Sequence, residues 1–76
     1  MVDQIQGVAV QVAPHLAYVQ VGPLTLEVRI SLQTAQAISA GGEVHLYTVL
    51  LLPREEGIPA LYGFATIEER QQFLAL

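Results

Sequence analysis

The alternation of apolar and polar residues predicts that most of this chain forms β-strands. The clearest example is the segment 24–30, in which apolar and polar residues alternate without interruption. A period of two is typical of a strand with one buried face and one solvated face. We expect the inward set to be Leu24, Leu26, Val28 and Ile30, and the outward set to be Thr25, Glu27 and Arg29.

Two further strands are predicted before this segment. Residues 5–13 (IQGVAVQVA) are rich in β-branched valine, and residues 16–21 (LAYVQV) follow after a short turn. Gly22-Pro23 is a second turn signal, so the three strands are expected to form a meander. Gly7 lies inside the first strand, where a glycine often marks a bulge or a bend of a barrel.

The pattern changes after the third strand. Residues 31–40 (SLQTAQAISA) are rich in alanine and glutamine, which predicts a short helix that Gly41-Gly42 ends. Residues 44–52 (VHLYTVLLL) form the strongest predicted strand, and apolar side chains on both of its faces indicate burial on two sides. A polar turn over residues 53–59 then leads into a short return strand over residues 60–64.

The last predicted element is a helix. Thr66 is followed three residues later by Glu69, which is the spacing of a capping box at a helix N-terminus. We expect capping and the helix dipole alone to satisfy the carboxylates of Glu68 and Glu69. The apolar stripe of this helix is predicted to be Ile67, Phe73 and Leu74.

The order of these elements predicts a mainly β protein with the OB-fold. That fold is a Greek-key barrel, here with five or six strands, a short helix inserted between the third and fourth strands and a C-terminal helix. We assign the barrel domain to residues 1–64. Residues 65–76 are interpreted as the start of a helix that leads into a further domain, absent from this chain.

Composition narrows the possible functions. The chain has 76 residues, of which 53% are hydrophobic and 13% charged, whereas about 25% charged is usual. So apolar a composition indicates that part of the surface meets a partner subunit or a missing domain. Without cysteine, and with His15 and His45 far apart, we expect no disulfide, no metal and no cofactor. No apolar run could span a membrane and no signal peptide is visible, so we expect a soluble, cytoplasmic protein.

Charge and motifs argue against strong DNA binding by this segment alone and against enzymatic activity. The net charge is −4 and lysine is absent, whereas proteins that grip nucleic-acid phosphates usually carry a basic patch. This segment alone should therefore bind DNA weakly. The sequence contains neither a glycine-rich phosphate loop nor a recognisable set of nucleophile, base and acid, so we do not expect an enzyme.

Several blocks of residues resemble a known family. The opening Ile5-Gln6-Gly7 is similar to it, and the most specific block is Arg54-Glu55-Glu56 followed six residues later by Tyr62-Gly63-Phe64 and then by Glu69-Arg70. In this order the blocks resemble the bacterial RuvA proteins, the junction-binding subunits of the Holliday junction branch-migration complex of recombination and DNA repair. The resemblance extends over the whole chain.

The resemblance implies a role and a site. It implies an N-terminal OB domain that assembles as a homotetramer and presents a flat face to a four-way DNA junction. Glu55 and Glu56 match the acidic pin that separates strands at the crossover, and Arg54 beside them could contact a phosphate. The family's helix-hairpin-helix repeats, which grip the junction, and its C-terminal domain, which binds the RuvB motor ATPase, would follow this segment. Such a subunit is not itself catalytic.

The chain departs from the family in its first strand. Asp3 stands where glycine is common, and Gln4 and Gln6 stand where basic residues are common. These departures put phosphate contacts from this strand in doubt.

The sequence leaves two other interpretations open. From local sequence alone, the Pro-Arg-Glu-Glu-Gly turn is an ordinary solvated hairpin. The chain could also be a generic OB-type module that binds protein or a single strand, with Tyr62 and Phe64 as a stacking platform. We favour a packing role, in which these aromatics plug the barrel end and Gly63 permits close backbone approach. His45 is expected to be packed or at the surface, and His15 exposed.

Overall fold

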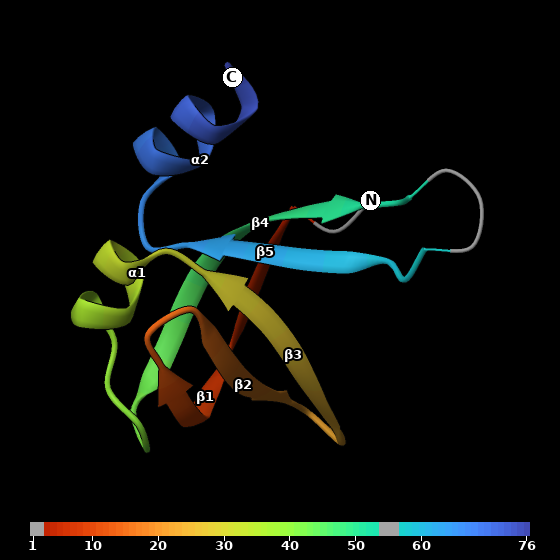
Figure 1. The fold of residues 1–76 in the computed structure, drawn as a ribbon. Coiled ribbons are helices and arrows are strands. Elements are labelled where there is room, and N and C mark those ends of the chain that lie inside the picture. The colour runs from red at the N-terminus through yellow and green to blue at the C-terminus, as the bar shows by residue number, and fades with distance from the viewer. Residues whose placement is uncertain (1–2, 54–56) are drawn as a thin grey trace.

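The computed structural model describes residues 3–53 and 57–76 and contains a closed five-stranded barrel with two short helices (Figure 1). This architecture confirms the predicted mainly β class and is consistent with an OB-fold. The elements in chain order are β1 (Gln4–Ala13), β2 (Leu16–Val21), β3 (Leu24–Ile30), α1 (Leu32–Ala37), β4 (Glu43–Leu51), β5 (Ala60–Phe64) and α2 (Ile67–Leu74).

The barrel closes through one parallel pair of strands. Around the barrel the strand order is β1-β2-β3-β5-β4, with β4 returning to β1. The β1–β2, β2–β3, β4–β5 and β1–β4 pairs are antiparallel, whereas β3 and β5 run parallel, with Val28 opposite Leu61. Because parallel neighbours need a long crossover, the segment that contains α1 and β4 separates β3 from β5 in sequence.

The first strand bends where it changes partners. Val8 lies opposite Gln20 of β2 and also opposite Glu43 of β4. Gly7 lies just before this point, and a Cβ there would overlap the carbonyl oxygen of Gln20. The irregularity in strand register, which would mark a bulge, lies later, between Ala9 and Gln11. Gly7 serves the close approach of two backbones rather than a bulge.

A small apolar core fills the barrel. Its buried members come from β1 to β4, and the half-buried Leu61 of β5 packs against them. Among the described residues, the buried hydrophobic side chains are Ile5, Ala9, Ala17, Val19, Val28, Ile30, Val44, Leu46, Val49 and Phe64.

The alternation predicted for the third strand holds except at its start. Val28 and Ile30 are buried, Leu26 is half-buried, and Thr25, Glu27 and Arg29 are exposed. Leu24, however, is 62% exposed. The reason is its position, because it is the first residue after the turn at Gly22 and lies beyond the packed layer of the barrel.

The inserted helix is shorter than the sequence predicted. It begins after Ser31, whose hydroxyl accepts a hydrogen bond from the Thr34 N–H, and it ends at Ala37 because Ile38 is extended. Gly41 has a positive φ of 87° and forms a turn, not a helix stop. That turn is tied to the barrel, since the N–H of Gly41 donates to the carbonyl of Ala9 and the N–H of Ala9 donates to that of Gly42.

The fourth strand is buried on two sides only in its second half. Glu43 and His45 are exposed while Val44 and Leu46 are buried, so the first half alternates. The prediction of two-sided burial is correct only at Thr48 and Val49, which are consecutive and buried, whereas Leu50 is half-buried and Leu51 is exposed. This difference has a structural cause, because α2 packs against β4 and β5 (Figure 1) and covers part of the outer surface.

Candidate functional site

The β4–β5 hairpin extends beyond the neighbouring strands. Its ladder continues to the pair Leu51 and Ala60. The partner strands end earlier, since β1 reaches only to Tyr47 of β4, and β3 reaches only to Leu61 of β5. We refer to residues 50–53 and 57–60 as the distal hairpin, the end of the β4–β5 hairpin that projects beyond the neighbouring strands (Figure 1).

The predicted acidic site belongs to the connection within this hairpin. Arg54, Glu55 and Glu56 lie outside the described residues, so their predicted roles stay predictions. On either side of them the chain is close together, because a Cβ on Gly57 would lie 2.5 Å from the Cβ of Pro53. This proximity explains why a glycine suits position 57.

Apolar side chains are exposed on the distal hairpin. Leu51 is 43% exposed, Leu52 68% and Ile58 86%. Exposed apolar side chains that gather on one projecting element are typical of surfaces that meet a partner.

A carboxylate joins the two helices. Glu69 of α2 accepts hydrogen bonds from the hydroxyl of Ser31 at 2.6 Å and from the hydroxyl of Thr34 at 2.7 Å. The Thr34 hydroxyl oxygen in turn accepts from the N–H of Ala65 at 3.1 Å, and Thr34 is completely buried. The expectation that capping alone satisfies Glu69 is therefore wrong. Only the Thr66 half of the capping box is present, in which the Thr66 hydroxyl accepts from the Glu69 N–H.

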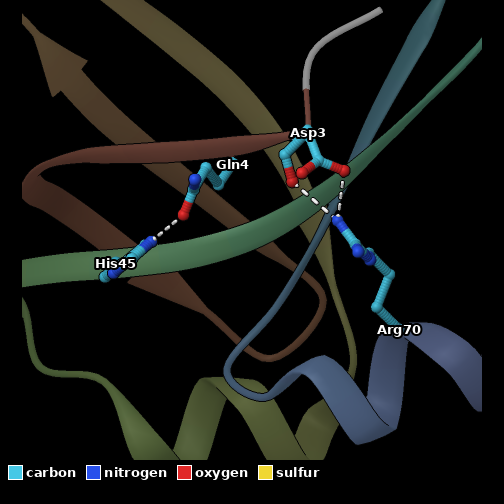
Figure 2. Close-up of polar contacts among 4 residues, drawn as sticks. All are labelled: Asp3, Gln4, His45 and Arg70. Carbon is cyan, nitrogen blue, oxygen red and sulfur yellow. Dashed lines mark hydrogen bonds and ion pairs between the residues drawn. The ribbon is translucent and has the colours of Figure 1, made fainter.

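An arginine joins the same helix to the beginning of β1. As Figure 2 shows, Arg70 Nη1 reaches Asp3, donating to its carboxylate oxygen Oδ1 at 2.6 Å and to its backbone carbonyl at 2.8 Å. The guanidinium also lies 6.0 Å from the centroid of the Tyr47 ring, within range of a cation–π contact. We refer to the residues that hold α2 in this way as the α2 joint: Asp3, Ser31, Thr34, Tyr47, Glu69 and Arg70.

A polar group occupies the outer face of β1 and β4. His45 Nε2 lies 2.5 Å from the Gln4 side-chain oxygen (Figure 2), and its Nδ1 lies 3.4 Å from the Gln6 side-chain nitrogen. The imidazole stacks on Tyr47, with 4.9 Å between ring centroids. His45 is thus the surface histidine that was one of the two expected alternatives.

The aromatic residues of β5 are engaged within the protein. Tyr62 and Phe64 contact the ring of Phe73 of α2, at centroid distances of 5.2 and 5.1 Å. Phe64 is only 5% exposed. Gly63 makes room for core side chains rather than for backbone, because a Cβ there would lie 2.7 Å from Val28 Cγ1. These contacts favour the predicted packing role over a base-stacking platform.

Comparison with known proteins gives one consistent result. Residues 1–63 match the family model described as the RuvA N terminal domain. The chain belongs to this family. It is 40% identical over 74 residues to the Holliday junction branch migration complex subunit RuvA of Opitutus terrae, an alignment that covers 96% of the chain and 36% of that protein. The subunit from Sulfurimonas denitrificans is 38% identical, with coverage of 96% and 37%.

A third relative aligns with the entire chain. The RuvA subunit of Amoebophilus asiaticus is 36% identical over 77 residues, which cover 100% of the chain and 39% of that protein. The chain therefore spans under two-fifths of the length of these curated RuvA relatives.

The residues at which the first strand was expected to depart from the family make specific contacts. Asp3 is the acceptor for Arg70. Gln4 and Gln6 contact His45. None of these contacts was predicted, since the partners lie 39 to 67 residues apart in sequence and no local spacing signals them.

Residues 3–53 and 57–76 offer neither a cluster of metal ligands nor a membrane-spanning helix. Among residues 3–53 and 57–76, no three His, Asp or Glu side chains lie close enough together to hold a metal ion. In the same residues, no helix is both long and apolar enough to cross a membrane.

Proposed function

We propose that this chain is the assembly and junction-shaping domain of a RuvA subunit, which binds four-way DNA junctions and promotes branch migration. The observation that carries the proposal is the family match over residues 1–63. The relatives are named as subunits of the Holliday junction branch migration complex, which supports the same role here.

The proposed contribution of the distal hairpin is repulsion. Glu55 and Glu56 stand in the connection between β4 and β5. A junction centre is rich in phosphates, and two like charges about 4 Å apart in water repel by about 1 kcal/mol, more where water is excluded. Fourfold assembly would multiply this repulsion, so the carboxylates would hold strands apart while basic contacts elsewhere supply affinity. Arg54 would contact a phosphate beside the crossover.

The exposed apolar residues of the distal hairpin support the proposed assembly. Leu51, Leu52 and Ile58 flank the acidic pair and are exposed in the single chain. Covering them with a second copy would remove apolar area from water, at about 25 cal/mol for each Å². A tetramer would in this way place the acidic connections of its subunits near one another.

The rest of the proposed function belongs to the longer protein. Because the chain spans 36% to 39% of the three relatives compared, we assign most of the affinity for junction DNA to a following helix-hairpin-helix domain. We assign contact with the RuvB motor ATPase to a C-terminal domain. In this proposal the subunit is not catalytic and acts in the cytoplasm, where its DNA substrate would be.

The alternative of a single-strand-binding module has less support. Such a module needs exposed aromatic and basic side chains along a groove. Here Tyr62 and Phe64 contact Phe73, and Arg70 is paired with Asp3.

A matched pair of double variants in the full-length protein tests the proposal. E55Q/E56Q removes two negative charges from the connection between β4 and β5, and E27Q/E43Q removes two from exposed positions on β3 and β4. We expect E55Q/E56Q to bind a four-way junction several-fold more tightly and to change the speed of branch migration, while E27Q/E43Q changes both much less. Equal behaviour of the two variants in both assays would exclude the acidic pin.

A further inference from the structure

The C-terminal helix α2 contacts the barrel through the ring of Phe73, which packs on Tyr62 and Phe64, but it has no fully buried residue. The helix has eight residues. An isolated helix of this length is unstable in water. Its position must therefore come from specific contacts with the barrel.

The first contact is the Glu69 carboxylate, which binds α1. Its two oxygens accept from two different hydroxyls, those of Ser31 and Thr34. Both donors have second partners, because Ser31 caps α1 through the Thr34 N–H and the Thr34 hydroxyl accepts from Ala65. Hydrogen bonds to a charged acceptor are directional and stronger than neutral ones. This contact therefore fixes the start of α2 relative to α1.

The second contact is the Arg70 guanidinium, which binds a different part of the barrel from Glu69. It reaches Asp3 at the beginning of β1 and lies near the Tyr47 ring of β4. Adjacent residues of one helical turn thus attach α2 to two separate places. Two anchors in different directions restrict rotation of a helix as well as its translation.

The arginine contact adds little to stability. Asp3 is 77% exposed at its side chain, and exposed ion pairs contribute about 0 to 1 kcal/mol. The Arg70 Nε is buried without a hydrogen-bond partner among residues 3–53 and 57–76, which is itself unfavourable. Removal of the Arg70 contact should consequently change the direction of α2 more than it changes the free energy of unfolding.

We propose that Glu69 and Arg70 are positioning residues that fix the direction of α2, and with it the angle at which a following DNA-gripping domain meets the junction. The second clause rests on the proposed function, whereas the first concerns this chain alone. Nothing in the family match or in the names of the relatives assigns a role to either residue.

Residual dipolar couplings and ¹⁵N relaxation of the 76-residue chain test the first clause. The variants are E69A/R70A, the single variant R70M, and the control E68A/Q72A, which truncates two exposed side chains of the same helix. In the parent chain and the control, we expect the couplings of α2 to fit the alignment tensor of the barrel, with order parameters of about 0.85.

In E69A/R70A we expect the order parameters of residues 67–74 to fall below about 0.6, with barrel couplings unchanged. If this double variant also unfolds the barrel, R70M decides the question, because it should change the orientation of α2 while moving Tm by less than about 5 °C. Couplings of α2 that still fit the barrel tensor in R70M, or in a folded E69A/R70A, would overturn the proposal.

The full-length protein tests the second clause. We expect R70M to lower the preference for a four-way junction over a linear duplex several-fold, with duplex affinity unchanged. An unchanged preference, despite reoriented α2, would overturn this clause. Failure of the proposed function itself would look different, because the parent protein would then show no preference for the junction.

Discussion

The distal hairpin and the α2 joint are two regions of the same barrel that differ in the kind of side chain they present. The distal hairpin projects from the barrel and exposes apolar side chains, with Ile58 86% exposed. In the α2 joint the key groups are polar, and the buried Thr34 hydroxyl both donates and accepts a hydrogen bond. In this chain a few charged side chains hold a helix in place. The exposed apolar side chains of the distal hairpin are the ones proposed for assembly.

The largest effect on stability is expected from the α2 joint. Replacing Thr34 by Val keeps the shape but removes the donor to Glu69 and the acceptor of the Ala65 N–H. Leaving buried polar groups without partners costs about 1 to 3 kcal/mol each. We expect T34V to lower the free energy of unfolding by about 3 kcal/mol, measured by urea denaturation. A loss below about 0.5 kcal/mol would show that the network contributes little.

A smaller effect is expected at the base of the distal hairpin. A Cβ at position 57 would lie 2.5 Å from the Cβ of Pro53, but Pro53 is exposed and can shift. We therefore expect G57A to cost about 1 kcal/mol, at the low end of the usual cost of overpacking. The urea midpoint measures this loss, and a cost equal to that of T34V would contradict the contrast between the two regions.

A still smaller effect is expected from the exposed ion pair. D3A removes the 2.6 Å contact with Arg70 but leaves the backbone carbonyl of residue 3 as an acceptor. We expect a loss of about 0.5 kcal/mol, which 1 M salt should largely abolish because it shortens the screening length to about 3 Å. A loss that is large and independent of salt would mean that Asp3 acts in another way.

The smallest effect on the fold is expected for the exposed apolar side chains. In L52S/I58S two side chains that are 68% and 86% exposed become polar, so the free energy of unfolding of the single chain should change by less than about 0.5 kcal/mol. Self-association of the full-length protein, measured by sedimentation, should weaken at least tenfold. Unchanged association would remove the distal hairpin from the proposed interface.

The sequence was sufficient to predict most of the strands but not the contacts between distant elements. Alternation of apolar residues identified β3, and β-branched residues identified β1, because local pattern and burial coincide in a strand. Helix α1 was predicted too long, since alanine and glutamine favour a helix, whereas the backbone becomes extended at Ile38. Glu69 looked satisfied by its own helix, and nothing near it in sequence indicates Ser31 or Thr34.

Local sequence was also insufficient to predict the acidic site. The role predicted for Glu55 and Glu56 came from resemblance to a family. Local sequence alone does not indicate it, because two carboxylates in a turn have no distinctive pattern. Their proposed role depends on the arrangement of several chains around DNA. A single sequence does not contain that arrangement.

The most direct test of the central claim is the salt dependence of junction binding by the full-length protein. If Glu55 and Glu56 repel the phosphates at the crossover, the ratio of affinities between E55Q/E56Q and E27Q/E43Q should favour the first variant most at low salt. That ratio should shrink as the screening length falls from about 30 Å at 0.01 M to about 8 Å at 0.15 M. A ratio of one at every salt concentration would contradict the account.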